Sequence, residues 1–200
     1  VILGVRALAT PLACGNAVVF KPSEHTPHVS QALSRALEQE LPDCVGVVQG
    51  GVPETTRLLQ HRFDHLFFTG NSAVGRVVMR AAAEHLTPVT LELGGKSPHI
   101  IFPDADIEAA VNGVISGIFA AAGQTCMAGS RLIVHESIHD AFIEKLVARM
   151  GEARLGDPRH DTTDVGPIAT EPQLAKTLDL IEVAKAEGAT CVLGGKRPAA

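Results

Sequence analysis

Short apolar segments rich in β-branched residues alternate with segments of helical periodicity along the 200-residue chain. The predicted strands cover residues 17–20, 45–48, 65–68, 89–93, 99–102, 131–134 and 191–193. Helices are predicted from Pro27, from about Pro53, and over about 72–84, 106–121, 137–150 and 171–187. Regular alternation of strand and helix is typical of an α/β protein in which helices cover both faces of a parallel sheet. We therefore expect this fold class.

Two of the predicted helices carry an apolar side. Thr26 is the expected N-cap of the first and Pro27 its first residue. The apolar positions of that helix are Val29, Ala32, Leu33, Ala36 and Leu37. Those of the helix over 72–84 are Val74, Val77, Val78, Ala81 and Ala82. Each set falls on one face, as in a helix that packs by that face.

Charge, hydropathy and cysteine spacing exclude several classes of function. The net charge is −5 and no basic stripe is present, which argues against nucleic-acid binding. The apolar runs are only a few residues long, so no segment is expected to span a membrane. The four cysteines lie far apart without a C-x-x-C pair, which favours a reducing, cytoplasmic location. We expect three of them to be inert structural thiols: Cys14, Cys44 and Cys191.

The fourth cysteine lies in the stretch GQTCMAGSR, which runs from Gly123 to Arg131. Glycine, alanine and threonine surround Cys126, and an apolar run lies on either side of the stretch. A cysteine inside an apolar run is usually a small buried hydrophobe. In a turn of small residues, which other loops can approach closely, it can instead be a nucleophile, so Cys126 is a candidate catalytic residue.

The stretch LELGGK places Glu92 between two leucines in a predicted strand. A carboxylate in an apolar strand is costly unless it is paired or functional. Burial would raise the pKa of Glu92 toward the range of a general base. The alternative is an ordinary strand alternation in which Glu92 faces solvent.

Two further stretches follow predicted strands. In FKPSE, Lys21 and Glu24 lie beyond the end of a strand, where ligands of parallel sheets bind and where the two could hydrogen-bond a ribose. In FFTGNSAVG, a strand runs through Gly70 to a helix that contains Gly75, and backbone N–H groups at such a helix start can hold phosphate. The second stretch is not a Walker A loop. The alternative for FKPSE is a solvated turn, and the alternative for FFTGNSAVG is an ordinary tight turn.

The stretch HESIH matches the zinc-protease pattern H-E-x-x-H. Zinc binding through this pattern needs both histidines on one helical face. Here His135 ends a predicted strand, and Ser137 with Asp140 has the form of a capping box, so the helix is expected to begin after His135. The rings of His135 and His139 should then diverge, and we expect no metal site.

Four motifs together resemble the aldehyde dehydrogenase superfamily: KPSE, FTGNSAVG, LELGGKSP and GQTCMAGSR, in that order across nearly the whole chain. The resemblance implies a Rossmann-like dinucleotide-binding domain over residues 1–94 and an α/β catalytic domain over 95–200, with the boundary at GGKSP and both domains incomplete. The chain starts at Val1 and ends in GGKRPAA, and we expect it to be a central excerpt. An upstream asparagine of the oxyanion hole and downstream cofactor and oligomerisation segments should lie outside it.

The resemblance also implies roles for individual residues. Cys126 matches the nucleophile and Glu92 the general base. The positions that match cofactor-binding residues are Lys21 and Glu24 at the adenosine ribose, Gly50 near the adenine, Gly70, Asn71, Ser72, Val74 and Gly75 under the pyrophosphate, and Leu93 and Gly94 near the nicotinamide. Many members have a serine where this chain has Asn71.

The implied reaction is the NAD(P)-dependent oxidation of a small-molecule aldehyde to a carboxylic acid through a thiohemiacetal and a thioester on Cys126. Glu92 favours the hydrolytic reaction, because coenzyme A-acylating relatives typically lack this glutamate. The charge of Glu24 favours NAD, with NADP as a second possibility. The full-length protein is expected to be a homodimer or homotetramer. The alternative hypotheses for its function are a non-catalytic paralogue and a cysteine hydrolase.

Overall fold

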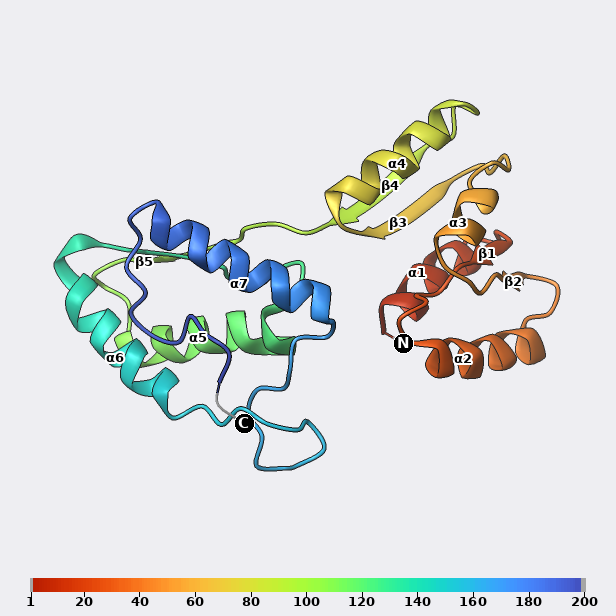
Figure 1. Ribbon diagram of the computed structural model, residues 1–200. Helices are drawn as coiled ribbons and strands as arrows, with labels where there is room; N and C mark the ends of the chain where they lie inside the picture. The colour runs from red at the N-terminus through yellow and green to blue at the C-terminus, as the bar shows by residue number, and fades with distance from the viewer. Residues whose placement is uncertain (1, 199–200) are drawn as a thin grey trace. The chain divides into compact units, whose positions relative to one another are not determined.

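The computed structural model describes residues 2–198, and the chain divides into two compact units. Unit 1 comprises Val1–Leu93 and unit 2 comprises Gly94–Ala200. Figure 1 labels the helices and, apart from β6, the strands of the two units. All three pairs of strands are parallel, and each pair is separated in sequence by a helix, which is the connection that parallel strands require. The α/β class predicted from the alternation is confirmed.

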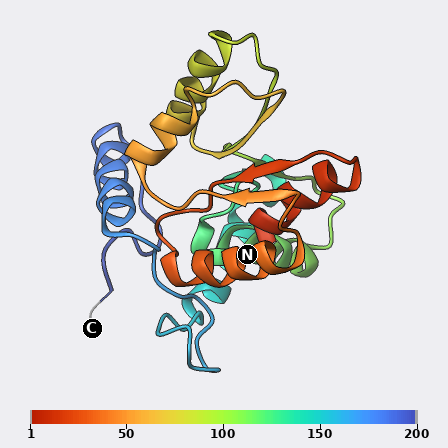
Figure 2. The same cartoon turned by 90° about the vertical axis from the view of Figure 1, so that its right-hand side faces the viewer.

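Unit 1 contains two of the parallel pairs. Its elements are α1 (Ile2–Ala13), β1 (Val18–Phe20), α2 (Pro27–Glu40), β2 (Val45–Val47), α3 (Val52–Leu58), β3 (Leu66–Gly70), α4 (Ser72–Ala83) and β4 (Val89–Leu93). β1 pairs with β2, and β3 pairs with β4 in a register that sets Thr69 opposite Glu92 and Gly70 opposite Leu93. Helix α4 packs along the β3–β4 pair, as Figures 1 and 2 show. This pairing places Gly70, where the turn into α4 begins, beside Leu93 at the end of the strand that carries Glu92.

Unit 2 is built around two helices and one parallel pair. Its elements are β5 (Pro98–Ile101), α5 (Ile107–Phe119), a tight turn (Ala120–Gly123), β6 (Arg131–Val134), a 3₁₀ turn (Glu136–Ile138), α6 (His139–Gly151) and α7 (Glu171–Ala186). The core lies between α5 and α6 and is formed by Val111, Val114, Phe142 and Leu146. Side chains of both strands, among them Ile101 and Leu132, pack against it. The stretch that carries Cys126 therefore connects a core helix to a core strand.

The prediction of a strand over 191–193 is wrong. These residues have no regular secondary structure, and Val192 and Leu193 are exposed. Within residues 2–198 no strand pairs with them. An apolar run becomes a strand only where a neighbouring strand can take its backbone hydrogen bonds.

The predicted buried faces of α2 and α4 are each displaced. In α2 the buried residues are Ser30 and Ser34, whereas Val29 is 44% exposed. The two serine hydroxyls donate hydrogen bonds to the Ser23 carbonyl and to Glu38, so their burial leaves no donor unsatisfied. Thr26 is the N-cap and Pro27 the first residue of α2, as predicted, although the Thr26 side chain makes no capping hydrogen bond.

In α4 the buried residues are Gly75, Val78 and Ala82, and the predicted Val74 and Val77 are exposed. Gly75 is buried in place of Val74 and Val77, because the lack of a side chain at Gly75 lets Leu93 approach the helix backbone.

Across the described part of the chain, every helix is too short or too polar to cross a bilayer.

Candidate active site

Cys126 lies in a turn of unit 2. The Ala128 backbone N–H donates to the Thr125 carbonyl oxygen at 3.2 Å, which closes the turn around Cys126 and Met127. Both of these residues are exposed, whereas Ala128 and Gly129 directly after them are buried. Within residues 2–198 the Cys126 backbone N–H donates to no other residue. An exposed thiol and an uncommitted N–H therefore belong to the same residue.

Three consecutive left-handed residues precede this turn. Ala121 has φ 49° and Ala122 φ 53°, and Gly123 has φ 75°. A left-handed backbone costs an L-residue roughly 1–2 kcal/mol, so the two alanines are strained. Strain of this kind collects at functional sites. Of these three left-handed residues, only Gly123 is of a type that predicts this conformation from the sequence.

The Gln124 side chain holds the strained residues in place. Its amide nitrogen donates to the Ala121 carbonyl oxygen at 3.2 Å, and its amide oxygen accepts from the Ala169 N–H at 3.0 Å. The chain before Cys126 is thereby tied to a segment more than forty residues away in sequence. Sequence reasoning did not assign a role to Gln124 beyond its place in the motif.

Glu92 follows the alternation of β4. Leu91 and Leu93 approach Gly75 of α4, and Glu92 lies between them on the opposite face of the strand, where it is exposed. The expectation of a buried carboxylate is therefore wrong within unit 1, and the solvent-facing alternative describes the residue. Glu92 and Leu93 end unit 1, whereas Gly94 and Cys126 belong to unit 2.

Lys21, Glu24 and Gly50 come together at the carboxyl ends of β1 and β2. Lys21 Nζ donates to Glu24 Oε2 at 2.9 Å and to the Gly50 carbonyl oxygen at 3.2 Å. The bond from Lys21 holds the pKa of the Glu24 carboxyl below its ordinary value. A pocket of about 170 Å³ opens here, lined by Pro22, Ser23, Glu24, Pro27, Ser30, Gln49, Gly50 and Gly51. Glu24 and Gly50, which the sequence associated with one ligand, thus line the same pocket, and Lys21 is hydrogen-bonded to both.

Glu54 shapes the same loop and was not predicted. Its carboxylate accepts the Gly51 N–H at 3.0 Å and caps the start of α3. Hydrogen bonds from the backbone N–H of Glu54 itself and from that of Gly51 lower the pKa of the Glu54 carboxyl. A side chain at Gly50 would overlap Glu54, and Gly50 also has φ 142°. Gly50 therefore has to be a glycine. A sequence signal was available, because Glu54 stands three residues after Gly51 at a helix start.

The turn from Gly70 to Gly75 leads into the N-terminus of α4. Asn71 is the N-cap, and its side-chain oxygen accepts the Val74 N–H at 2.9 Å. The Gly75 N–H donates to the Asn71 carbonyl oxygen at 2.9 Å. The N–H groups of Ser72 and Ala73 are the ones that remain for an anion, since the first N–H groups of a helix have no intrahelical partner. Asn71 acts as a cap here, which its position directly before the helix could have indicated.

His135 and His139 lie on different elements. His135 follows β6, and its ring accepts the Ser137 N–H at 3.2 Å, so it caps the 3₁₀ turn. His139 is the first residue of α6 and its ring contacts Asp140. The predicted capping box of Ser137 with Asp140 is wrong, because the turn is capped by the imidazole of His135, which accepts the Ser137 N–H. The two rings do not share a helical face.

The three cysteines expected to be structural are exposed. Cys14, Cys44 and Cys191 are free thiols at the surface, as Cys126 is. Cys14 directly follows α1 and Cys44 directly precedes β2, whereas Cys191 lies in the irregular chain after α7. Exposure alone therefore does not distinguish Cys126 from the others.

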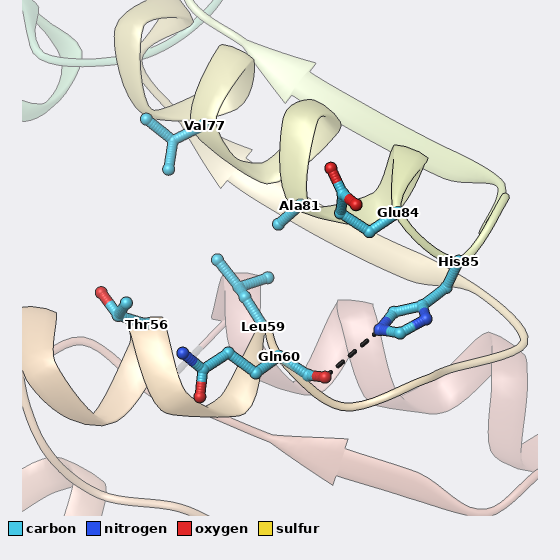
Figure 3. A pocket seen from close by; sticks show the side chains of 7 residues that line it. All are labelled: Thr56, Leu59, Gln60, Val77, Ala81, Glu84 and His85. Carbon is cyan, nitrogen blue, oxygen red and sulfur yellow. Dashed lines mark hydrogen bonds between the residues drawn. The ribbon is translucent and has the colours of Figure 1, made fainter.

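A larger pocket, of about 340 Å³, lies between α3 and α4. Figure 3 shows its lining, with the hydrogen-bonded contact between the His85 ring and the Gln60 carbonyl oxygen at 3.2 Å. None of the residues that sequence reasoning assigned to a site lines this pocket.

The whole chain, residues 1–200, matches the profile of the Aldehyde dehydrogenase family. It is 45% identical over 193 residues to betaine aldehyde dehydrogenase of Brucella anthropi, covering 95% of this chain and 40% of that protein. The structure is similar to betaine aldehyde dehydrogenase of Staphylococcus aureus in complex with NAD⁺, with a TM-score of 0.93 and 38% identity over 97% of this chain and 39% of that one. HpcC from Thermus thermophilus gives a TM-score of 0.92 at 39% identity, covering 96% and 38% of the two chains. The chain spans about 40% of the length of its curated relatives. It belongs to the aldehyde dehydrogenase family.

Proposed function

We propose that the full-length protein oxidises an aldehyde to a carboxylic acid with NAD⁺, using Cys126 as the nucleophile. The observation that carries the proposal is the Cys126 turn, in which an exposed thiol and a backbone N–H that has no hydrogen-bond partner within residues 2–198 belong to one residue. A nucleophile needs access to the carbonyl carbon, and the oxyanion that forms needs a donor close to it. The turn supplies both at one position.

We propose that unit 1 is the dinucleotide-binding part and unit 2 part of the catalytic domain. The pocket bounded by Glu24 and Gly50 suits an adenosine, since the ion pair with Lys21 uses Glu24 Oε2 and a carboxylate has a second oxygen for a ribose hydroxyl. The N-terminus of α4, with the N–H groups of Ser72 and Ala73, suits a pyrophosphate. The Glu24 charge would repel a 2′-phosphate, which supports NAD⁺ over NADP⁺. The family relative solved with NAD⁺ supports the same cofactor.

The chemistry of the chain's own residues proceeds in two stages. The Cys126 thiolate adds to the aldehyde carbon, and the new oxyanion accepts the Cys126 N–H. Bound NAD⁺ supplies the hydride acceptor. Loss of hydride from the thiohemiacetal leaves an acyl thioester on Cys126. Glu92 then takes a proton from water as the water attacks the thioester, which releases the carboxylic acid and the Cys126 thiolate and leaves the proton on Glu92.

Replacement of Glu92 tests this assignment in the full-length protein. Glu92→Gln keeps the side-chain shape but cannot take the proton from water. We expect one rapid equivalent of NADH per active site and then a steady rate lower by about 10²–10⁴-fold. Stopped-flow absorbance measures the burst, and intact mass after quenching detects an acyl adduct on Cys126. Glu84→Gln, an exposed glutamate of the same unit, is the control and should match the wild type.

Two results would contradict the mechanism. Loss of the burst in Glu92→Gln would mean that Glu92 acts before the thioester forms. Unchanged turnover would mean that the carboxylate only faces solvent.

We further propose a substrate, an assembly and a location for the full-length protein. Two relatives named betaine aldehyde dehydrogenase make betaine aldehyde the first substrate to assay. The family resemblance supports a homodimer or homotetramer. Four free thiols support a reducing, cytoplasmic location.

A further inference from the structure

We propose that His99 is a positioning residue for the Cys126 turn, acting through the space that its imidazole ring fills between Gly117 and Gly129. The inference rests on the proposed role of Cys126 as nucleophile. His99 lies on β5, opposite Leu132 of β6, and its side chain is half-buried. It is neither one of the residues assigned to the reaction nor part of the unit 1 pocket.

The ring lies directly against two glycine backbones. A Cβ placed on Gly117 of α5 would lie 2.6 Å from His99 Cε1 and 2.8 Å from Nε2, and a Cβ placed on Gly129 would overlap the same ring. The Gly129 N–H donates to the Gly117 carbonyl oxygen at 3.2 Å. Helix α5, the chain that leads into β6 and the His99 ring are therefore in mutual contact. Neither glycine has a left-handed φ, so close approach, rather than backbone conformation, requires a glycine at both positions.

This contact fixes the chain directly after Cys126. Gly129 and Ala128 are buried, and the Ala128 N–H closes the turn on Thr125. The Ser130 N–H donates to the Ala128 carbonyl oxygen at 2.7 Å, which stiffens the same link. A shift of Gly129 toward the place of the ring would therefore be passed to Cys126 over three residues. On the other side of the turn, the Gln124 side chain is hydrogen-bonded to the backbones of Ala121 and Ala169. His99 and Gln124 therefore fix the turn at its two ends.

A positioning role predicts a specific kinetic pattern. Without the ring, Gly129 can relax into the vacated space and the thiol and its N–H lose their fixed direction. Misplacement of a reacting group by about 1 Å can cost about 10²-fold in rate. We expect His99→Ala to lower kcat by up to about 10²-fold while the KM for NAD⁺, which reports on unit 1, stays unchanged. His99→Gln, whose flat amide reaches nearly as far as the ring, should recover most of kcat.

The experiment measures the full-length protein as wild type, His99→Ala, His99→Gln and His139→Ala. His139 is an exposed histidine of the same unit and serves as the matched control. Steady-state kinetics gives kcat and KM, and peptide mapping after brief iodoacetamide treatment gives the alkylation rate of Cys126 relative to Cys44 in unit 1. We expect His99→Ala to lower the relative rate of Cys126, and His139→Ala to leave it unchanged. Wild-type kcat and alkylation in His99→Ala would overturn the inference.

A second pair of variants keeps the inference testable if His99→Ala folds poorly. Gly129→Ala places its methyl group on the His99 ring and should inactivate the protein, whereas Gly129→Ala combined with His99→Ala has room for it and should be more active than Gly129→Ala alone. Equal damage in both backgrounds would overturn the inference. Cys126→Ala separates the two proposals: turnover that survives it refutes the proposed function, whereas Cys126-dependent turnover that ignores His99 refutes only the positioning role.

Discussion

The Gly50 loop of unit 1 and the Cys126 turn of unit 2 are both candidate site elements, but they are held in different ways. The Gly50 loop has a glycine at its one left-handed position, and charged side chains, Lys21 and Glu54, bind its backbone. The turn before Cys126 places two alanines at left-handed positions, and a neutral amide, Gln124, holds it.

The difference indicates what each element has to do. A loop that binds a cofactor gains from a relaxed, satisfied backbone, because ordering it on binding would cost affinity. A turn that presents a nucleophile needs a fixed direction for one thiol and one N–H, and strained residues persist where the surroundings over-determine them. Exchanging glycine and alanine at the two places should therefore shift stability in opposite directions.

The largest effect on stability is expected for Gly50→Ala. The substitution forces an alanine to φ 142° and overlaps its Cβ with Glu54. We expect a loss of about 2–3 kcal/mol in the free energy of unfolding, measured by urea denaturation of the chain. Gly46→Ala is the control, because a Cβ there has open space and an ordinary φ. A neutral Gly50→Ala would show that the loop is not held as described.

A smaller effect of opposite sign is expected for Ala121→Gly. Relief of the left-handed strain, about 1–2 kcal/mol, exceeds the backbone entropy that a glycine loses, about 0.5–1 kcal/mol. We expect a net gain of up to about 1.5 kcal/mol in the unfolding free energy by the same measurement. Ala120→Gly is the matched control: Ala120 has φ −51°, so only the entropic cost applies and stability should fall. If both variants lower stability equally, Ala121 is not strained.

The smallest effect concerns pH and the ion pair of the Gly50 loop. Lys21 lowers the pKa of Glu24 from its ordinary 4.5, so the stabilisation is fully present above that pH and is lost as the pH falls through the folded value. The Glu24 side chain is 42% exposed, which limits the contribution to about 0.5 kcal/mol or less. The unfolding free energies of wild type and Glu24→Gln should differ at neutral pH and converge in acid. A difference that persists in acid would assign the effect to packing rather than charge.

The sequence by itself determined the α/β class, nearly all the elements and the motifs that identify the family. These are local properties, because strand and helix periodicity, Pro27 at a helix start and Gly70 before another can be read within a few residues. The two candidate catalytic residues could also be recognised from the sequence. Cys126 among small residues and Glu92 between leucines stand out by their immediate neighbours in the chain.

Only the tertiary structure decided which faces are buried and what holds each site residue. It selected Ser30 and Ser34 over Val29 because their hydroxyls found acceptors, and it exposed Glu92 because α4 covers the other face of β4. It left 191–193 irregular because no strand within residues 2–198 pairs with them, and it set His99 against Gly129 across thirty positions of sequence. The reason is the same in each case: burial, pairing and close approach depend on a partner that is distant in sequence, and periodicity carries no information about that partner.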